Sequence, residues 1–367
     1  MIKIESLSKS FNEKKVINNL SLEVQKNEVI ALLGPNGSGK TTLLNMIAGL
    51  LRPDSGNIYI NNIMVNGTNG TKKVNLNPFE RQIGYVFQTI SLFPHMKIQD
   101  NISYGLKSLH LSKFEVKKRT SALLDFVGLR EHALSYPSQL SGGQQQRAAL
   151  ARSLATEPQV ILLDEPVSAT DPQLKETFRL ELKKYLQTLE ITTLYVTHNL
   201  SEAFMMADKI AVIGNGHIEQ VGNRAEIFDK TQSTYVAKFL GINIFEGKAV
   251  KEQNGLLLIE INGIPLMSAL TPEFVGKNVT ITLKPEDITL LTKEPVNTNS
   301  DNSIIGVITE IVQMHSTAQV TVDAGFPVKA RIAFTTIKNL GITVGDKVYM
   351  SFSPLSLNVF SDTEKRK

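Results

Sequence analysis

The chain has 367 residues, of which 42% are hydrophobic and 20% are charged, and its formal net charge is +4. This length is ample for two or more domains, and a net charge so small for the size does not indicate nucleic-acid binding. The sequence has no cysteine, which excludes disulfides and thiolate metal sites, and it has no run of 18 apolar residues that would predict a transmembrane helix.

Short strands are expected at the start of the chain. Residues 1–11 favour a strand over a signal peptide, and the apolar run 28–33 is typical of a buried strand. A helix is expected over residues 42–50. Residues 34–41 lie between this strand and this helix and read GPNGSGKT, which fits the phosphate-loop pattern GxxxxGK[ST] at every fixed position.

This loop predicts a site for the phosphates of ATP. Its glycines let the backbone curl so that N–H groups face phosphate oxygens, and the helix that follows presents its positive end to them. We expect Lys40 to reach the β- and γ-phosphates and the Thr41 hydroxyl to ligate Mg²⁺. The residues expected to bind the nucleotide here are Gly34, Pro35, Asn36, Gly37, Ser38, Gly39, Lys40, Thr41 and Thr42.

The middle of the chain changes from a strand pattern to a helical pattern. Residues 66–73, NGTNGTKK, predict a mobile polar hairpin loop of unknown role. From residue 89 to about 155 the pattern is helical, with periodic apolar positions over 113–127. Another helix is expected from Ser141 to Arg152. Its N-terminus would present a hydroxyl and several N–H groups, a ready anion site formed by Ser141, Gly142, Gly143 and Gln144.

Two further strands end on polar side chains. Residues 160–163 are apolar and lead into Asp164 and Glu165, and ligands bind at the carboxyl ends of strands in open α/β sheets. We expect Asp164 to ligate Mg²⁺ and Glu165 to act as the general base that orients and polarises the attacking water. His198 follows another apolar strand, over residues 192–196.

The order of these motifs resembles that of the ATP-binding-cassette (ABC) family, whose signature is similar to LSGGQQQR at residues 140–147. The resemblance covers roughly residues 1–240. It implies that residues 141–144 bind the γ-phosphate of the ATP held by a second subunit. Two ATP molecules would then join a homodimer, and hydrolysis would let the dimer open.

The resemblance also implies roles for side chains outside the phosphate loop. His198 would contact the γ-phosphate, Gln88 would sense Mg²⁺ and the attacking water, and Phe11 would stack on adenine. Asp171, in the segment PVSATD, would lie across the dimer seam, and Thr170 departs slightly from the family, which usually has leucine there. The expected catalytic residues are thus Glu165, His198 and Gln88, and the expected Mg²⁺ ligands are Thr41, Gln88 and Asp164.

The implied architecture is an α/β P-loop NTPase domain over residues 1–240, with a helical subdomain at about 89–155, followed by an all-β domain over residues 241–367. In the ABC family such a chain is the ATPase of an importer. The apolar cluster at residues 91–96 would receive a coupling helix from the membrane permease, and an extracytoplasmic binding protein would deliver the cargo. The ATPase would lie on the cytoplasmic face of the membrane, bound through the permease.

The tail has short β runs separated by turn residues, as in small barrels, and the polar stretch 294–303 predicts a linker between two lobes. It resembles the TOBE or Mop-like domain (an OB-type barrel) found after importer ATPases. Residues 284–288, KPEDI, are similar to the RPED connection of that domain, with lysine for the usual arginine. Residues 239–247 and 320–328 resemble molybdate/tungstate importer ATPases, so the expected cargo is an oxyanion.

Alternatives stay open for the tail and the cargo. Residues 351–355, SFSPL, depart from a lysine-containing segment of the family, so the tail either binds oxyanion through N–H groups and hydroxyls or only strengthens the dimer. Other cargoes are sulfate, iron(III), polyamine and sugar. A soluble ABC ATPase of translation or repair usually has two cassettes or a long coiled insertion. A regulator without catalysis would not need Lys40, Asp164, Glu165 and His198 intact.

Overall fold

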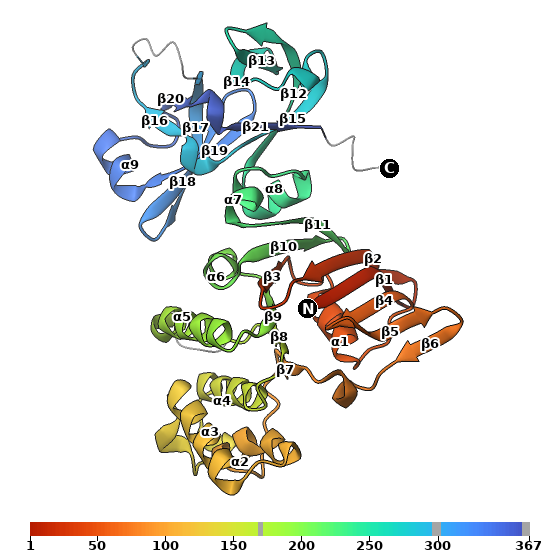
Figure 1. The fold of residues 1–367 in the computed structure, drawn as a ribbon. Coiled ribbons are helices and arrows are strands. Elements are labelled where there is room, and N and C mark those ends of the chain that lie inside the picture. Colours follow the sequence, from red (N-terminus) through yellow and green to blue (C-terminus); the bar gives the residue numbers. More distant parts are fainter. Residues whose placement is uncertain (168–171, 296–301, 362–367) are drawn as a thin grey trace. The chain divides into compact units, whose positions relative to one another are not determined.

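The computed structural model describes residues 1–167, 172–295 and 302–361, and the chain forms two compact units, Met1–Arg224 and Ala225–Lys367 (Figure 1). We expected the boundary at residue 240. It lies earlier because the short helices α7 (Arg224–Phe228) and α8 (Thr234–Leu240) fall almost wholly within the second unit, where α8 packs against the first strand of that unit.

The first unit holds two sheets. The antiparallel sheet has the order β2-β1-β4-β5-β6, and the larger sheet has the order β11-β10-β3-β9-β8-β7, in which all strands but β11 run parallel. The strands of the antiparallel sheet are β1 (Ile2–Phe11), β2 (Lys14–Val24), β4 (Ser55–Ile60), β5 (Ile63–Asn69) and β6 (Lys72–Asn75). Those of the larger sheet are β3 (Val29–Leu33), β7 (Gly84–Val86), β8 (Val160–Asp164), β9 (Thr192–Thr197), β10 (Lys209–Gly214) and β11 (His217–Gly222).

The central strands of the parallel sheet are buried on both faces. Every residue of β3, β8 and β9 is buried, and successive side chains of a strand point to opposite faces. Leu162 accordingly packs in one apolar cluster with residues of the helix after β3, whereas Ile161 and Leu163 pack in another with the later helices. Because parallel strands share a direction, the polar residues that follow β3, β8 and β9 meet at one edge.

Helices fill the expected helical region and the connections between strands. The region about 89–155 contains three of them, and Ser112 caps the second by accepting a hydrogen bond from the Glu115 N–H. The helices of this unit are α1 (Lys40–Ala48), α2 (Ile98–Ser103), α3 (Lys113–Phe126), α4 (Gly142–Leu154), α5 (Pro172–Thr188) and α6 (Leu200–Met206). Short 3-10 helices lie at Pro78–Arg81, Gly105–Leu109, Arg130–His132 and Pro137–Gln139.

The segment 66–73 forms a hairpin, as expected, but paired strands rather than loop residues make up most of it. Asn66 pairs with Asn75 and Asn69 with Lys72, so β5 and β6 join through a two-residue turn at Gly70 and Thr71. Gly70 has φ 58°, a left-handed conformation that glycine adopts without strain. Hydrogen bonds between β5 and β6 therefore order this segment. Amino-acid composition alone does not predict such bonds.

The second unit consists of two five-stranded antiparallel sheets, ordered β14-β13-β12-β15-β21 and β16-β20-β17-β18-β19. The predicted strand-rich fold is thus confirmed, but the two sheets do not follow one another along the chain. The last strand pairs with β15 in the first sheet, and β16 pairs with β20 in the second. Residues 296–301 of the expected linker lie outside the described residues, and Asn302 begins β17.

The strands of this unit are β12 (Asn243–Gln253), β13 (Leu256–Ile261), β14 (Ile264–Ala269), β15 (Asn278–Leu283), β16 (Thr289–Leu291), β17 (Asn302–Met314), β18 (Thr317–Asp323), β19 (Pro327–Ala333), β20 (Lys347–Phe352) and β21 (Leu357–Phe360). Its remaining helix is α9 (Phe334–Leu340), with 3-10 turns at Pro272–Phe274, Pro285–Asp287 and Pro354–Ser356. Apolar residues of both sheets share one core, in which the rings of Phe245 and Phe326 meet with centroids 5.1 Å apart. Buried Asn243 joins the sheets by hydrogen bonds to Leu283 and Lys329.

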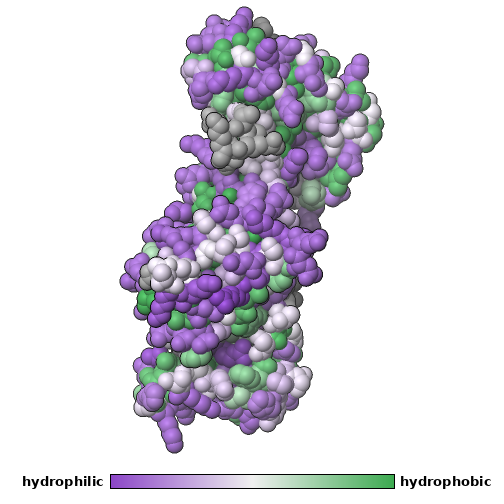
Figure 2. Space-filling view, turned by 90° about the vertical axis from the view of Figure 1, so that its right-hand side faces the viewer, coloured by the Kyte–Doolittle hydropathy of each residue, from purple (hydrophilic) through white to green (hydrophobic). Residues whose placement is uncertain are grey.

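Among the described residues, no helix is long and apolar enough to cross a membrane. On the face drawn in Figure 2 hydrophilic residues predominate, and hydrophobic residues form small separated groups. Singly exposed apolar side chains of this kind are normal on protein surfaces.

Candidate active site

A cleft of about 410 Å³ lies at the edge where the parallel strands end. It brings together side chains from the antiparallel sheet, the phosphate loop, the start of α1 and the ends of β7 and β8. Its lining includes most of the residues expected from sequence, namely Phe11, Asn36, Gly37, Gly39, Lys40, Thr41, Thr42, Gln88, Asp164 and Glu165, together with Val16.

The phosphate loop has a backbone that larger residues could not adopt. A Cβ atom on Gly34 would lie 2.5 Å from the carbonyl oxygen of Ile213, which belongs to the neighbouring strand β10. Gly37 and Gly39 have φ angles of 79° and 98°, in the left-handed region. The buried hydroxyl of Ser38 has no hydrogen-bond partner among the described residues, and a phosphate oxygen would supply one.

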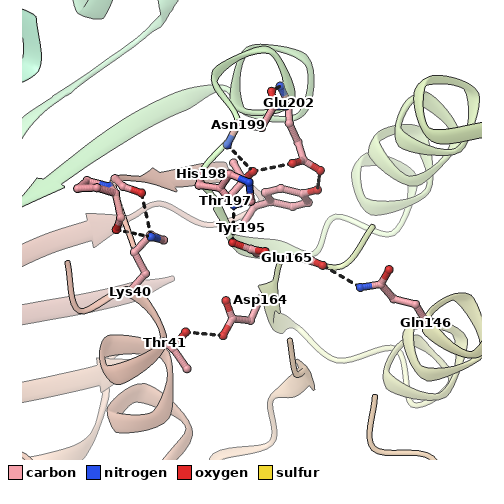
Figure 3. A network of polar contacts seen from close by, with 12 residues as sticks. Lys40, Thr41, Gln146, Asp164, Glu165, Tyr195, Thr197, His198, Asn199 and Glu202 are labelled. Atoms are coloured by element: carbon pink, nitrogen blue, oxygen red, sulfur yellow. Dashed lines mark hydrogen bonds and ion pairs between the residues drawn. The ribbon is translucent and has the colours of Figure 1, made fainter. Parts of the chain in front are cut away.

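Lys40 is nearly enclosed by this loop. Its ammonium group donates hydrogen bonds to the carbonyl oxygens of Gly34 at 2.9 Å and Pro35 at 2.8 Å (Figure 3). Burial lowers the pKa of Lys40, and the nearby carboxylates of Glu165 and Asp164 oppose that shift. The loop thus holds a cation that two acidic side chains help to stabilise.

Thr41 and Asp164 place two oxygen-bearing side chains beside Lys40. The Thr41 hydroxyl donates a hydrogen bond of 2.8 Å to Oδ2 of Asp164, a side chain that ends β8 and is almost fully buried. Burial raises the pKa of Asp164, and the bond from Thr41 opposes this shift. Hydroxyl and carboxylate oxygens are the ligands that Mg²⁺ prefers in nucleotide sites, so this donor set fits that ion.

Glu165 and His198 lie next to these donors. The Nδ1 atom of His198 is 2.7 Å from Oε1 of Glu165, and Figure 3 shows the two side chains directed toward one another. Glu165 has φ 49°, an uncommon conformation for this residue type. It is fixed on both sides, because its N–H donates to the carbonyl of Val196 at 3.0 Å and its own carbonyl accepts from Gln146 at 2.9 Å.

Phe11 and Gln88 enter the cleft from opposite parts of the unit. Phe11 ends β1 with 45% of its surface exposed, and the Lys9 ammonium lies 5.6 Å from its ring centroid. An exposed ring beside a cleft offers a flat surface for a base to stack on. Gln88 follows β7 and lines the cleft beside Asp164 and Glu165.

The residues of the expected anion site at α4 lie elsewhere. The described residues that line the cleft include none of Ser141–Gln144. Ser141 caps α4 by accepting a hydrogen bond from the Gln144 N–H, and the Gln144 side chain accepts one from the Ser141 N–H. Asp171 lies outside the described residues, so its place relative to the cleft is not described.

Sequence reasoning missed the groups behind Glu165 and His198. Gln146 was read only as part of the signature helix. The residues Arg179, Tyr195, Thr197, Asn199 and Glu202 form a hydrogen-bonded network under the His198 segment. One signal was present in the sequence: Asn199 followed three residues later by Glu202 is a helix-start pattern, and Asn199 does cap α6.

Comparison with known proteins identifies the family. A sequence profile described as "ABC transporter" matches residues 17–168. The molybdate/tungstate import ATP-binding protein WtpC of Pyrococcus abyssi is 36% identical over 362 residues, which cover 98% of this chain and 100% of that protein. The chain belongs to the ABC transporter family, among its import ATP-binding proteins. Such proteins are ATPases that bind ATP, so the cleft belongs to an ATP-hydrolysing enzyme.

Other ABC proteins also match this chain. The spermidine/putrescine import ATP-binding protein PotA of Thermotoga maritima is 36% identical, over 89% of this chain and 88% of that protein. PotA of Acetivibrio thermocellus is also 36% identical, over 100% and 97%. The bacterial ABC cassette MJ0796, solved in dimeric form and in a post-hydrolysis state with ADP and Pi, shares 32% identity at a TM-score of 0.55, over 61% of this chain and 98% of the cassette.

Proposed function

We propose that this ABC ATPase is the nucleotide-binding subunit of an importer and works as a homodimer at the cytoplasmic face of the membrane. The observation that carries the proposal is the cleft itself, where the Thr41–Asp164 pair and Glu165 adjoin one phosphate loop. His198 contacts this Glu165 from outside the described lining of the cleft. A base, a metal-ligand set and a cationic phosphate cradle thus converge on one place, as phosphoryl transfer to water requires.

The side chains divide the work of hydrolysis. Lys40, Ser38 and the loop N–H groups bind the phosphates, and Phe11 stacks on the base. Thr41, Asp164 and Gln88 would hold Mg²⁺, which would neutralise charge on the phosphate oxygens. Glu165 accepts a proton from the attacking water, which Gln88 helps to orient. His198 stands 2.7 Å from the base and donates toward the γ-phosphate.

A second copy of the chain completes the site. The cap of α4, with Ser141 and the N–H groups of Gly142 and Gly143, is absent from the described lining of its own cleft but has the character of an anion site. The dimeric form of MJ0796 supports the same arrangement. We infer that Ser141–Gln144, together with Asp171, act on the nucleotide held by the partner subunit.

The test is the Glu165→Gln variant of the full chain, mixed with ATP and Mg²⁺. Removing the base while keeping ATP binding should trap an ATP-bound dimer, detectable by size-exclusion chromatography with light scattering, and should lower kcat by about 10²–10⁴-fold. The matched control is Glu157→Gln, since Glu157 lies outside the cleft. Hydrolysis by Glu165→Gln at the parent rate would refute the base assignment.

The permease contact is proposed for residues 91–96, which follow Gln88. Phe93 is held in place there, because its N–H donates to Oδ1 of buried Asn101 at 2.8 Å and its ring lies 5.1 Å from the Arg152 guanidinium. A fixed apolar segment next to Gln88 suits the transmission of nucleotide state to a membrane partner. Cysteine crosslinking between position 91 and the permease loops tests this contact.

We propose molybdate or tungstate as the cargo, delivered by an extracytoplasmic binding protein. WtpC supports this reading, and so does the stretch 320–328, most of which forms β18 and the start of β19. Polyamine import is the second candidate, because two PotA proteins match at the same identity. Sulfate, iron(III) and sugar remain alternatives from the sequence.

Uptake assays decide the cargo. Cells carrying Lys40→Ala in place of the parent chain should lose uptake of labelled molybdate and tungstate and keep uptake of spermidine. The reverse pattern would assign the chain to polyamine import. Calorimetric titration of the full chain with molybdate, tungstate and sulfate then shows whether the second unit binds oxyanion or serves only the dimer.

A further inference from the structure

A buried carboxylate lies beneath the segment that carries His198. Glu202 is 6% exposed, and both of its oxygens are occupied. Oε1 accepts hydrogen bonds from the Tyr195 hydroxyl at 2.6 Å and from Arg179 Nε at 3.1 Å, and Oε2 accepts one from the Thr197 hydroxyl at 2.5 Å. Glu202 and Arg179 are thus a buried ion pair with two additional hydroxyl donors.

This network spans three elements of the fold. Arg179 comes from α5, Tyr195 and Thr197 from β9, and Glu202 from α6 (Figure 3 shows the last three). Taking two charges out of water is costly, and a buried pair is retained at that cost only where its geometry is well satisfied. Its hydrogen bonds fix the angle at which β9 gives way to α6.

The residues on either side of His198 are tied to this pair. Thr197 donates to Glu202 and also accepts from the Asn199 N–H at 3.0 Å, while the Asn199 side chain accepts from the Glu202 N–H at 3.0 Å. His198 lies between Thr197 and Asn199, so its backbone is held on both sides. Its ring, with the side chain 57% exposed, contacts Oε1 of Glu165 through Nδ1.

We propose that Arg179 and Glu202 are positioning residues for hydrolysis, which hold His198 at hydrogen-bond distance from Glu165 and join this pair to helix α5. The inference rests on the proposed roles of Glu165 and His198. Arg179 lies on α5 and donates to Glu202 on α6, so this bond carries a shift of α5 to the segment that holds His198. The Arg179–Glu202 pair thus makes the distance between His198 and Glu165 depend on the position of α5.

Variants of the full chain that change one polar side chain at a time test the proposal. Glu202→Gln, Arg179→Met and Thr197→Val should each lower kcat about tenfold or more, while KM for ATP stays within about twofold, because the phosphate loop is untouched. Arg179→Lys keeps the charge and should recover part of the rate. The control is Lys209→Met, which breaks the ion pair with Glu28 (2.9 Å) at the start of β10.

A double variant separates positioning from a general loss of structure. If Glu202 acts through His198, adding Glu202→Gln to His198→Ala should change the residual rate by less than about twofold. An equal loss in both backgrounds, or a parent-level kcat for folded Glu202→Gln, would overturn the inference. Failure of the proposed function looks different, because His198→Ala alone would then hydrolyse ATP at the parent rate.

Discussion

The side-chain amide of Gln146 donates a hydrogen bond to the main-chain carbonyl of Glu165, with a distance of 2.9 Å between Nε2 and the oxygen. Gln146 is 2% exposed and lies on α4, the helix whose first turn carries the signature glycines. Glu165 has a left-handed backbone, which persists only where neighbouring groups hold it. One side chain therefore links the signature helix to the proposed catalytic base of the same subunit.

Replacing Gln146 by alanine should lower kcat about tenfold with little change in ATP affinity. The buried carbonyl of Glu165 would lose its partner, and its backbone would be free to relax away from the water-activating geometry. Steady-state ATP hydrolysis measures the effect. Gln145→Ala is the matched control, since the neighbouring amide donates to the carbonyl of Leu140 at 3.1 Å instead. Equal rates for the two variants would show that the Gln146 bond is only structural.

Asp164→Asn should abolish Mg²⁺-dependent hydrolysis while making the protein more stable at neutral pH. Burial raises the folded-state pKa of Asp164 above the ordinary value of 3.8, so the native protein binds this proton more tightly than the unfolded chain does. The proton's stabilising effect is fully present below the unfolded pKa and is lost as pH rises through the folded pKa. Asparagine cannot ionise, so the variant keeps its stability as the pH rises.

Thermal melts at several pH values check the Asp164→Asn prediction. At pH 7 the variant should melt at a higher temperature than the parent, and this difference in Tm should shrink toward zero near pH 4. A variant less stable than the parent at pH 7 would contradict the assigned direction of the shift.

Gly34→Ala should destabilise the first unit and weaken ATP binding more than Gly37→Ala does. The new methyl group at position 34 would meet the Ile213 carbonyl at 2.5 Å, a backbone atom that moves only with β10. Overpacking of this kind costs about 1–3 kcal/mol. At Gly37 no atom lies within 4 Å, so only the left-handed φ opposes alanine. Calorimetric melts and nucleotide titration measure the stability and the ATP affinity of the two variants. A Gly37→Ala variant that is the less stable of the two would refute the clash at position 34.

Asn243→Ala should unfold the second unit at a lower temperature and leave hydrolysis by the first unit unchanged. The Asn243 amide donates to the carbonyls of Leu283 and Lys329, and its oxygen accepts from the Lys329 N–H, so alanine leaves buried groups of both sheets unpaired. The expected loss is about 1–3 kcal/mol. Exposed Gln253→Ala serves as control, and a melt like that of the control would show that the sheets do not depend on Asn243.

The sequence predicted the cleft well where its parts are close in the chain. Residues 34–41 specify their own turn, and Asp164 and Glu165 emerge from a strand that apolar composition reveals. Each of these groups depends on a local pattern, so position along the chain nearly determines position in the fold. The structure duly brings Lys40, Thr41, Asp164 and Glu165 to one cleft.

Hydrogen bonds between residues far apart in the sequence could not be predicted in this way. Gln146 and Glu165 are 19 positions apart, and Arg179 and Glu202 are 23 apart, so their contacts arise from helix packing that no local pattern records. The partners of β16 and β21, which are β20 and β15, could not be predicted from the sequence for a related reason. Short strands have many possible neighbours, and the shared core decides among them.

The return of β21 to the sheet begun by β12 has a consequence for biosynthesis. β15 gains its outer neighbour only from residues 357–360, and Asn358 also donates to the Thr231 carbonyl at 2.8 Å, more than a hundred positions earlier. On the ribosome, β15 must therefore keep an open edge until residues 357–360 have been synthesised. A chain that stops before residue 357 would have a complete first unit and a second unit with an unpaired, aggregation-prone strand edge.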